Sequence, residues 1–138
     1  MPSATYAKYT NAIEPMLEGD NAGTAAWKVA LAATVNAANT TFVAGTTDLA
    51  TGGGYTQGGT AASTTSAGMD TGAYKLVLAS PAMWTATGAG FTFRYAILWN
   101  STSSVPVAYW DYGSSQVVAA GETVTVTLDA SGGVFTAT

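Results

Sequence analysis

The stretch FTFRYAILWNSTSSVPVAYWDYG, residues 91–113, decides the fold of this chain. Two apolar runs rich in aromatic and β-branched residues flank the polar linker NSTSS, which has the length of a five-residue hairpin loop. Such a loop pairs Trp99 with Val105 and places every second residue of each run on one face. The face that we predict as the core consists of Phe91, Phe93, Tyr95, Ile97, Trp99, Val105, Val107 and Tyr109.

The opposite face of this hairpin carries Leu98, Arg94, Trp110 and Tyr112. The same register places Arg94 opposite Trp110, with Tyr112 nearby, and predicts a cation–π contact. Trp, Tyr and Arg are enriched at the hot spots of protein interfaces, so we predict that this face contributes to a subunit contact. Three interpretations are open: another part of the chain covers the face, a second subunit covers it, or it is an aromatic platform for a sugar.

Asp111 interrupts the apolar pattern, because its position would point a carboxylate inward near Phe93. A β-bulge or the end of a strand would resolve this conflict by turning the side chain away from the core. We therefore expect an irregularity at Asp111 and a turn or capping role for its carboxylate, not a catalytic one.

Alternation of apolar and polar residues recurs in segments 27–33 (WKVALAA), 74–79 (YKLVLA) and 122–128 (ETVTVTL). Gly132-Gly133 then predicts a turn into a last strand, VFTAT. Many short strands with turn signals between them predict a mainly β fold, an antiparallel β-sandwich or jelly-roll-like arrangement. No linker divides the chain, so we expect residues 1–138 to form a single domain.

Two segments depart from this alternation. Within residues 1–20, apolar side chains recur at helical spacing after Ser3, which predicts a short N-terminal helix or arm that stops or kinks near Pro15. Residues 50–72 are rich in Gly, Ser and Thr, and we expect a long exposed connection with short edge strands, anchored by Tyr55 and Met69. No Gly-Lys-Ser/Thr follows these glycines, so they do not indicate a phosphate loop. We also assign Tyr55 to the contact surface.

The composition argues against most catalytic chemistry. Only 9% of the residues are charged, the net charge is −4, and the chain contains neither cysteine nor histidine. The commonest general base and the thiolate ligands of metals are therefore missing, and we predict a non-enzymatic protein without a cofactor. A calcium site built from Asp48, Asp70 and loop carbonyls stays open, although no DxDxD-like spacing supports it. The four basic residues are scattered, which argues against direct binding of nucleic acid.

No run of residues approaches the roughly 20 apolar positions of a membrane-spanning helix. The N-terminal segment MPSATYAKYTNAIEPMLEGD also lacks the apolar centre of a secretory signal. The expectation is a soluble protein made in the cytoplasm, with no membrane partner.

The order of the sequence elements carries a resemblance across nearly the whole chain. A predicted N-terminal helix precedes "WKVAL", "GGGYTQGG", "MWTAT", "FRYAILWN", "AYWDYG" and "GGVFTAT". This series resembles small structural proteins of tailed bacteriophages that decorate or cement the capsid. The resemblance implies a component of the virion, with the major capsid protein or other virion proteins as partners, a homo-oligomeric state and no catalytic residue. Docking of many copies would then add modest contacts through avidity.

Two other functions are compatible with the same residues. A neck or tail connector, or a fibre component, would use similar contact surfaces in fewer copies. A carbohydrate-binding surface module would use Trp110, Tyr112 and Tyr55 as stacking platforms.

Overall fold

The computed structural model describes residues 4–10, 12, 23–70, 72–131 and 133–137. The described residues form ten strands: β1 (Thr5–Lys8), β2 (Trp27–Ala32), β3 (Thr60–Ala61), β4 (Thr64–Asp70), β5 (Ala73–Leu78), β6 (Trp84–Thr85), β7 (Phe91–Asn100), β8 (Val105–Val118), β9 (Thr123–Val124) and β10 (Phe135–Ala137). They build a five-stranded sheet in the order β1-β8-β7-β2-β3, a three-stranded sheet β10-β5-β4 and the pair β6-β9. Every pairing is antiparallel, so the predicted mainly β, antiparallel class is confirmed.

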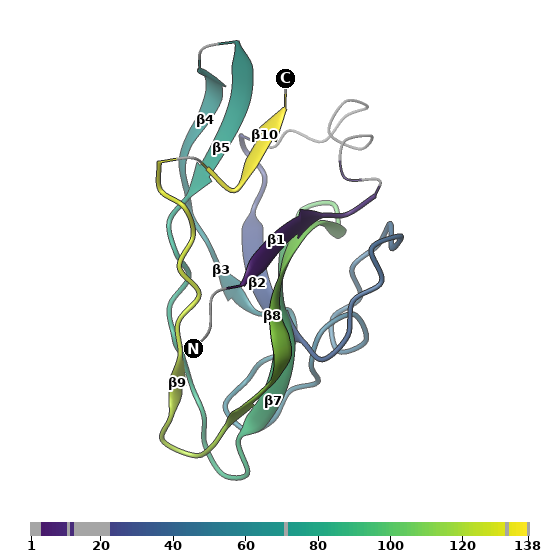
Figure 1. Ribbon diagram of the computed structural model, residues 1–138, viewed down its shortest axis with the longest axis vertical. Helices are drawn as coiled ribbons and strands as arrows, with labels where there is room; N and C mark the ends of the chain where they lie inside the picture. Colours follow the sequence, from purple (N-terminus) through teal and green to yellow (C-terminus); the bar gives the residue numbers. More distant parts are fainter. Residues whose placement is uncertain (1–3, 11, 13–22, 71, 132, 138) are drawn as a thin grey trace.

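The five-stranded sheet lies between two other parts of the chain (Figure 1). The strands of the two smaller sheets run along one side of it, and the irregular segment 33–59 between β2 and β3, drawn in blue, lies on the other. This arrangement explains why the central strands are buried on both faces. Val29, Ala30, Leu31 and Ala32 are all 0% exposed, although alternation alone predicts one solvent face.

The predicted short N-terminal helix is not seen. Thr5–Lys8 instead form β1, which pairs with β8 so that Tyr6 lies opposite Trp110. The spacing of the tyrosines favours a helix, but over so few residues it is outweighed by pairing with a long neighbouring strand. The rest of the predicted helix, residues 13–18, lies outside the described residues.

The β7–β8 hairpin forms as predicted, but its register differs. Residues 101–104 make a four-residue turn, so Asn100 faces Val105, and Trp99 faces Pro106 where Val105 was predicted. The Asn100 side-chain oxygen accepts hydrogen bonds from the backbone N–H groups of Thr102 (3.0 Å) and Ser103 (3.3 Å), which shortens the loop by one residue. A second shift between Leu98 and Trp99 then places Ala108 opposite Leu98.

Segment 33–59 is held against the sheet by aromatic contacts. Phe42 stacks on Trp99 with ring centroids 3.9 Å apart and an angle of 11° between the rings. The indole N–H of Trp99 donates to the carbonyl oxygen of Gly58 at 2.9 Å. Trp99 therefore faces this segment, and Leu98, its neighbour in an alternating strand, points to the other side of the sheet.

The predicted connection 50–72 contains β3 and β4, and each lies at the edge of its sheet. Tyr55 is 1% exposed and anchors the segment as predicted. The same prediction is wrong for Met69, which is 71% exposed, because β4 lies at the edge of its sheet.

Candidate interaction surface

The residues predicted to form one contact surface separate into different environments. Tyr55 (1% exposed), Leu98 (0%) and Tyr112 (9%) are buried. Leu98 and Tyr112 therefore lack the exposure that a contact surface needs. Leu98 lies on the face that another part of the same chain covers, which was the first of the three interpretations. Tyr112 packs edge-on against Phe93, with ring centroids 5.3 Å apart and an angle of 83°.

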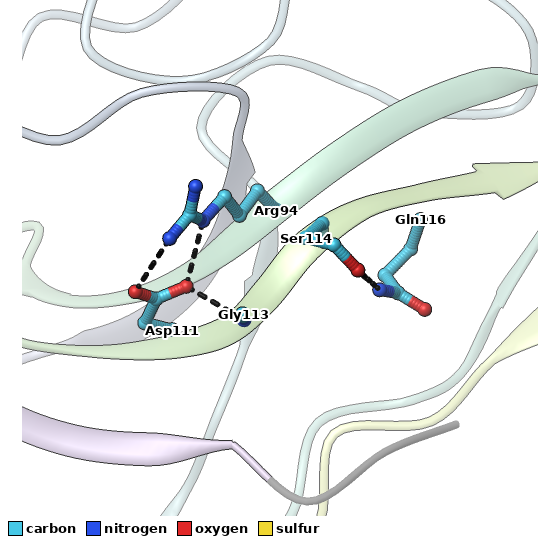
Figure 2. Close-up of polar contacts among 5 residues, drawn as sticks. All are labelled: Arg94, Asp111, Gly113, Ser114 and Gln116. Carbon is cyan, nitrogen blue, oxygen red and sulfur yellow. Dashed lines mark hydrogen bonds and ion pairs between the residues drawn. The ribbon is translucent and has the colours of Figure 1, made fainter.

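Arg94 forms an ion pair with Asp111, and the predicted cation–π contact with Trp110 is wrong. Figure 2 shows the two side chains meeting between β7 and β8: Nε lies 2.8 Å from Oδ1 and Nη2 lies 3.1 Å from Oδ2. The guanidinium also lies 5.2 Å from the centre of the Tyr95 ring. The changed register is the cause, because Asp111, not Trp110, is brought beside Arg94.

This ion pair shifts the pKa values of both side chains. The hydrogen bonds from Arg94, and then the one from the backbone N–H of Gly113, lower the pKa of Asp111 below its ordinary value. The same hydrogen bonds to Asp111 raise the pKa of Arg94. Both side chains are about one-third exposed, so the pair lies on a solvated surface. There the two opposite charges offset each other.

A wide bulge in β8 positions this pair. Tyr95 faces Asp111 and Phe93 faces Gln116, so Arg94 alone lies opposite residues 112–115. The Asp111 Oδ1 atom accepts a hydrogen bond from the N–H of Gly113 at 2.8 Å, and the Gln116 Nε2 group donates to the Ser114 carbonyl oxygen at 2.9 Å (Figure 2). The irregularity and the turn role expected for Asp111 are thus confirmed.

Trp110 packs against Tyr6 across the β1–β8 pair. The ring centroids are 5.7 Å apart and the rings are inclined at 60°. Trp110 is half-buried and Tyr6 is 39% exposed, so the pair forms an aromatic ridge on the surface. Burial raises the pKa of the Tyr6 phenol to about 12. The sequence did not lead us to predict Tyr6 as a surface residue. The alternation of Thr5, Tyr6 and Ala7 could have indicated it.

The buried Asp48 carboxylate has a structural role. It accepts hydrogen bonds from the N–H groups of Gly45 (2.7 Å) and Gly58 (2.6 Å) and from the Tyr55 hydroxyl (2.5 Å). Both of its oxygens thus have partners within segment 33–59. The part of the chain that the structure describes holds no group of three or more His, Cys, Asp or Glu residues suited to a metal ion.

The surface on and beside β8 therefore offers two exposed features, the Tyr6–Trp110 ridge and the Arg94–Asp111 pair. Exposed aromatic rings and a neutralised ion pair each favour contact with another protein over binding of a charged ligand. No helix in the described part of the chain is long and apolar enough to cross a membrane. Comparisons with protein-family models, with curated proteins and with solved structures gave no match.

Proposed function

We propose that this chain is a structural protein of the virion of a tailed bacteriophage, a decoration or cement protein that docks on the capsid shell and stabilises it. Its partners would be the major capsid protein or neighbouring virion proteins, and its site of action would be the particle, after synthesis in the host cytoplasm. The order of the sequence elements supports this proposal. We further infer that its stacked antiparallel sheets constitute a β-sandwich-like domain.

The observation that carries the proposal is the exposed Tyr6–Trp110 ridge. Aromatic anchors that are held by the packing of their own subunit lose little conformational entropy when a partner covers them. Each copy would contribute a modest contact, and the repeated shell lattice would add these contacts through avidity and symmetry. The low charge of the chain also limits electrostatic repulsion between neighbouring copies.

The carbohydrate-binding alternative has less support. It requires Trp110, Tyr112 and Tyr55 as stacking platforms, and two of these rings are buried. The remaining one, Trp110, is packed against Tyr6 at 60° instead of lying in a flat, open row. A neck or tail connector would use the same ridge, and the number of copies per particle distinguishes it from a decoration protein.

The first experiment is to mix the purified protein with phage capsid shells that lack it and to measure bound copies by sedimentation. Saturation on the order of hundreds of copies per shell is expected for a decoration protein on a repeating lattice. A limit of about a dozen copies would point instead to a ring at the neck or tail. An absence of binding would overturn docking on the shell.

A pair of variants tests the ridge within the same assay. Trp110→Ala should weaken binding to the shells about tenfold or more, because truncation of an interface tryptophan commonly costs 2 kcal/mol or more. Met83→Ala removes another exposed apolar side chain, 61% exposed in the loop before β6, and should leave binding unchanged. Both variants are compared well below their melting temperatures. Equal binding by the two variants would remove the ridge from the proposal.

A further inference from the structure

Strand β4 is an unprotected sheet edge. It is the outer strand of the order β10-β5-β4, and the end of its hairpin with β5 lies at the top of the molecule in Figure 1, beyond β10. Its seven residues make it the longest edge strand in the described part of the chain; β1 has four and β10 has three.

Sheet edges are usually guarded by charged side chains or proline, since their unpaired N–H and C=O groups can pair with another strand. From Thr64 to Met69 no residue is charged and none is proline. All these side chains are exposed, and Gly68 between them is half-buried. Only a register shift at Thr65 and the terminal Asp70 interrupt the edge.

The ladder to β5 determines which backbone groups point outward. Asp70 and Ala73 are the last pair before a two-residue connection. The two residues of such a pair point their N–H and C=O groups at each other. Because hydrogen-bonded and non-hydrogen-bonded pairs alternate, Gly68 also points its N–H and C=O groups to β5. The N–H and C=O groups of Ala67 and Met69 consequently point away from the sheet.

We propose that β4 pairs with β4 of a second copy of this chain. The two strands run antiparallel about a two-fold axis at Gly68, so that Ala67 of each copy faces Met69 of the other. These are the residues whose backbone groups point outward, and the result is a continuous six-stranded sheet. The proposal does not depend on the virion function, because it concerns a different surface.

Three observations favour a second copy as the occupant. An antiparallel pair places the acidic Asp70 opposite the neutral Ser66, whereas a parallel pair would set the two Asp70 residues side by side. The large exposed Met69 faces the small Ala67, so the side chains complement each other in size. A shallow hollow of about 340 Å³, lined by Ser66–Met69 and Lys75, lies along the same segment, so space beside the strand is open to a partner.

Disulfide trapping tests the two-fold axis directly, because the chain has no cysteine of its own. Gly68 would face its own copy, with Cβ atoms about 4.5–5.5 Å apart in a non-hydrogen-bonded pair, within reach of a disulfide after a small shift. A Cβ atom added at Gly68 meets no atom within 4 Å. Gly68→Cys should therefore form a covalent dimer under mild oxidation, and Ala120→Cys, exposed in the turn after β8, should not.

A proline variant tests the outward backbone groups. Ala67→Pro removes an N–H that points away from β5 and so spares the β4–β5 ladder. By symmetry it deletes two intermolecular hydrogen bonds, and the dimer dissociation constant from sedimentation equilibrium should rise at least about tenfold. Ala67→Ser keeps the N–H and should leave that constant unchanged.

The outcomes are decisive in both directions. A protein that stays monomeric at high concentration, with no disulfide dimer at Gly68→Cys, overturns the proposal. A dimer whose dissociation constant is unaffected by Ala67→Pro also overturns it, because the copies then meet elsewhere. If Ala67→Pro lowers the melting temperature, the substitution also disturbs the fold. The proposed dimer is then accepted or rejected on the disulfide result for Gly68→Cys.

Discussion

The hydroxyl of Tyr55 joins the irregular segment 33–59 to Leu31 in the central sheet and also holds Asp48 within the segment. It donates to the Asp48 carboxylate at 2.5 Å and accepts from the backbone N–H of Leu31 in β2 at 3.0 Å. Burial and the bond to Asp48 raise the pKa of this phenol, so it stays neutral throughout the ordinary pH range. The buried Tyr55 side chain thus positions the Asp48 carboxylate, which in turn accepts hydrogen bonds from the backbone N–H groups of Gly45 and Gly58.

Replacing Tyr55 by Phe should lower the free energy of unfolding by about 1–3 kcal/mol, because the N–H of Leu31 loses its partner in a buried position. Chemical denaturation of Tyr55→Phe measures the loss. Tyr74→Phe in β5, outside this network, is the matched control and should change stability by less than about 0.5 kcal/mol. Equal effects of the two substitutions would contradict the role of the Tyr55 hydroxyl.

Gly59 is required by a close approach of two backbone segments. Its φ is +79°, and an added Cβ would lie 1.9 Å from the carbonyl oxygen of Val29. Gly121 has a similar φ of +87° but no atom within 4 Å of an added Cβ. Gly59→Ala should therefore destabilise by more than about 3 kcal/mol and Gly121→Ala by about 1 kcal/mol, since only the first combines strain with overlap. The same denaturation measurement compares them, and similar losses would refute the explanation.

The Arg94–Asp111 pair predicts a dependence of stability on acid. The folded-state pKa of Asp111 is lowered, so its contribution is present above the ordinary carboxyl value and is lost as the pH falls through the lowered pKa. Arg94→Leu should raise the pKa of Asp111 measured by NMR, but not fully, since Gly113 still donates. The stabilities of wild type and Arg94→Leu should differ near neutral pH and converge near about pH 2.

Arg94→Lys is the control for this prediction, because it keeps the charge but cannot form the bidentate contact. It should shift the pKa of Asp111 by less than Arg94→Leu does. An unchanged Asp111 pKa in Arg94→Leu would show that the turn, and not the guanidinium, lowers it.

The partly covered phenol of Tyr6 predicts a loss of stability in alkali. Burial raises the pKa of Tyr6 from 10.0 to about 12, so the unfolded chain releases this proton first. The folded state then binds more protons than the unfolded state, and stability falls as the pH rises above 10.0 and through about 12. Tyr6→Phe should flatten this fall when unfolding is followed across that range. An identical slope in Tyr6→Phe would contradict the shifted pKa.

Tyr9 presents the opposite case to Tyr55. It is 3% exposed, and its hydroxyl oxygen has no hydrogen-bond partner among the described residues. Its ring packs edge-on against Tyr109, with centroids 5.5 Å apart. Tyr9→Phe keeps that packing and removes an unsatisfied polar atom, so it should leave stability unchanged or raise it by about 1 kcal/mol. A loss of more than about 1 kcal/mol by denaturation would show that the hydroxyl has a partner after all.

Local patterns predicted those features whose cause lies within a few residues. The period of two in segments 27–33 and 74–79 predicted strands β2 and β5; β2 forms within its predicted bounds, and β5 begins one residue earlier, at Ala73. The conflict of Asp111 with its apolar neighbours predicted the bulge, because a carboxylate next to a turn glycine favours an Asx turn whatever packs around it. Tyr55, the one aromatic residue among glycines, was correctly predicted as an anchor.

Features that depend on the hairpin register or on distant partners escaped the same reasoning. The side chain of Asn100 shortened the hairpin loop by one residue, and this moved Arg94 from Trp110 to Asp111. Thr5–Lys8 became a strand only because β8 is long enough to pair with it. The burial of Leu98 required a second layer on a face that alternation alone left open.

The sequence by itself determined the mainly β class, the central hairpin and the scarcity of reactive groups, because alternation, turn residues and composition act locally. Only the tertiary structure decided which aromatic rings are buried, which reach solvent and which strand edge is left unpaired. Those properties depend on register and on layers that meet across long sequence separations, where a shift of one residue exchanges the two faces of a strand.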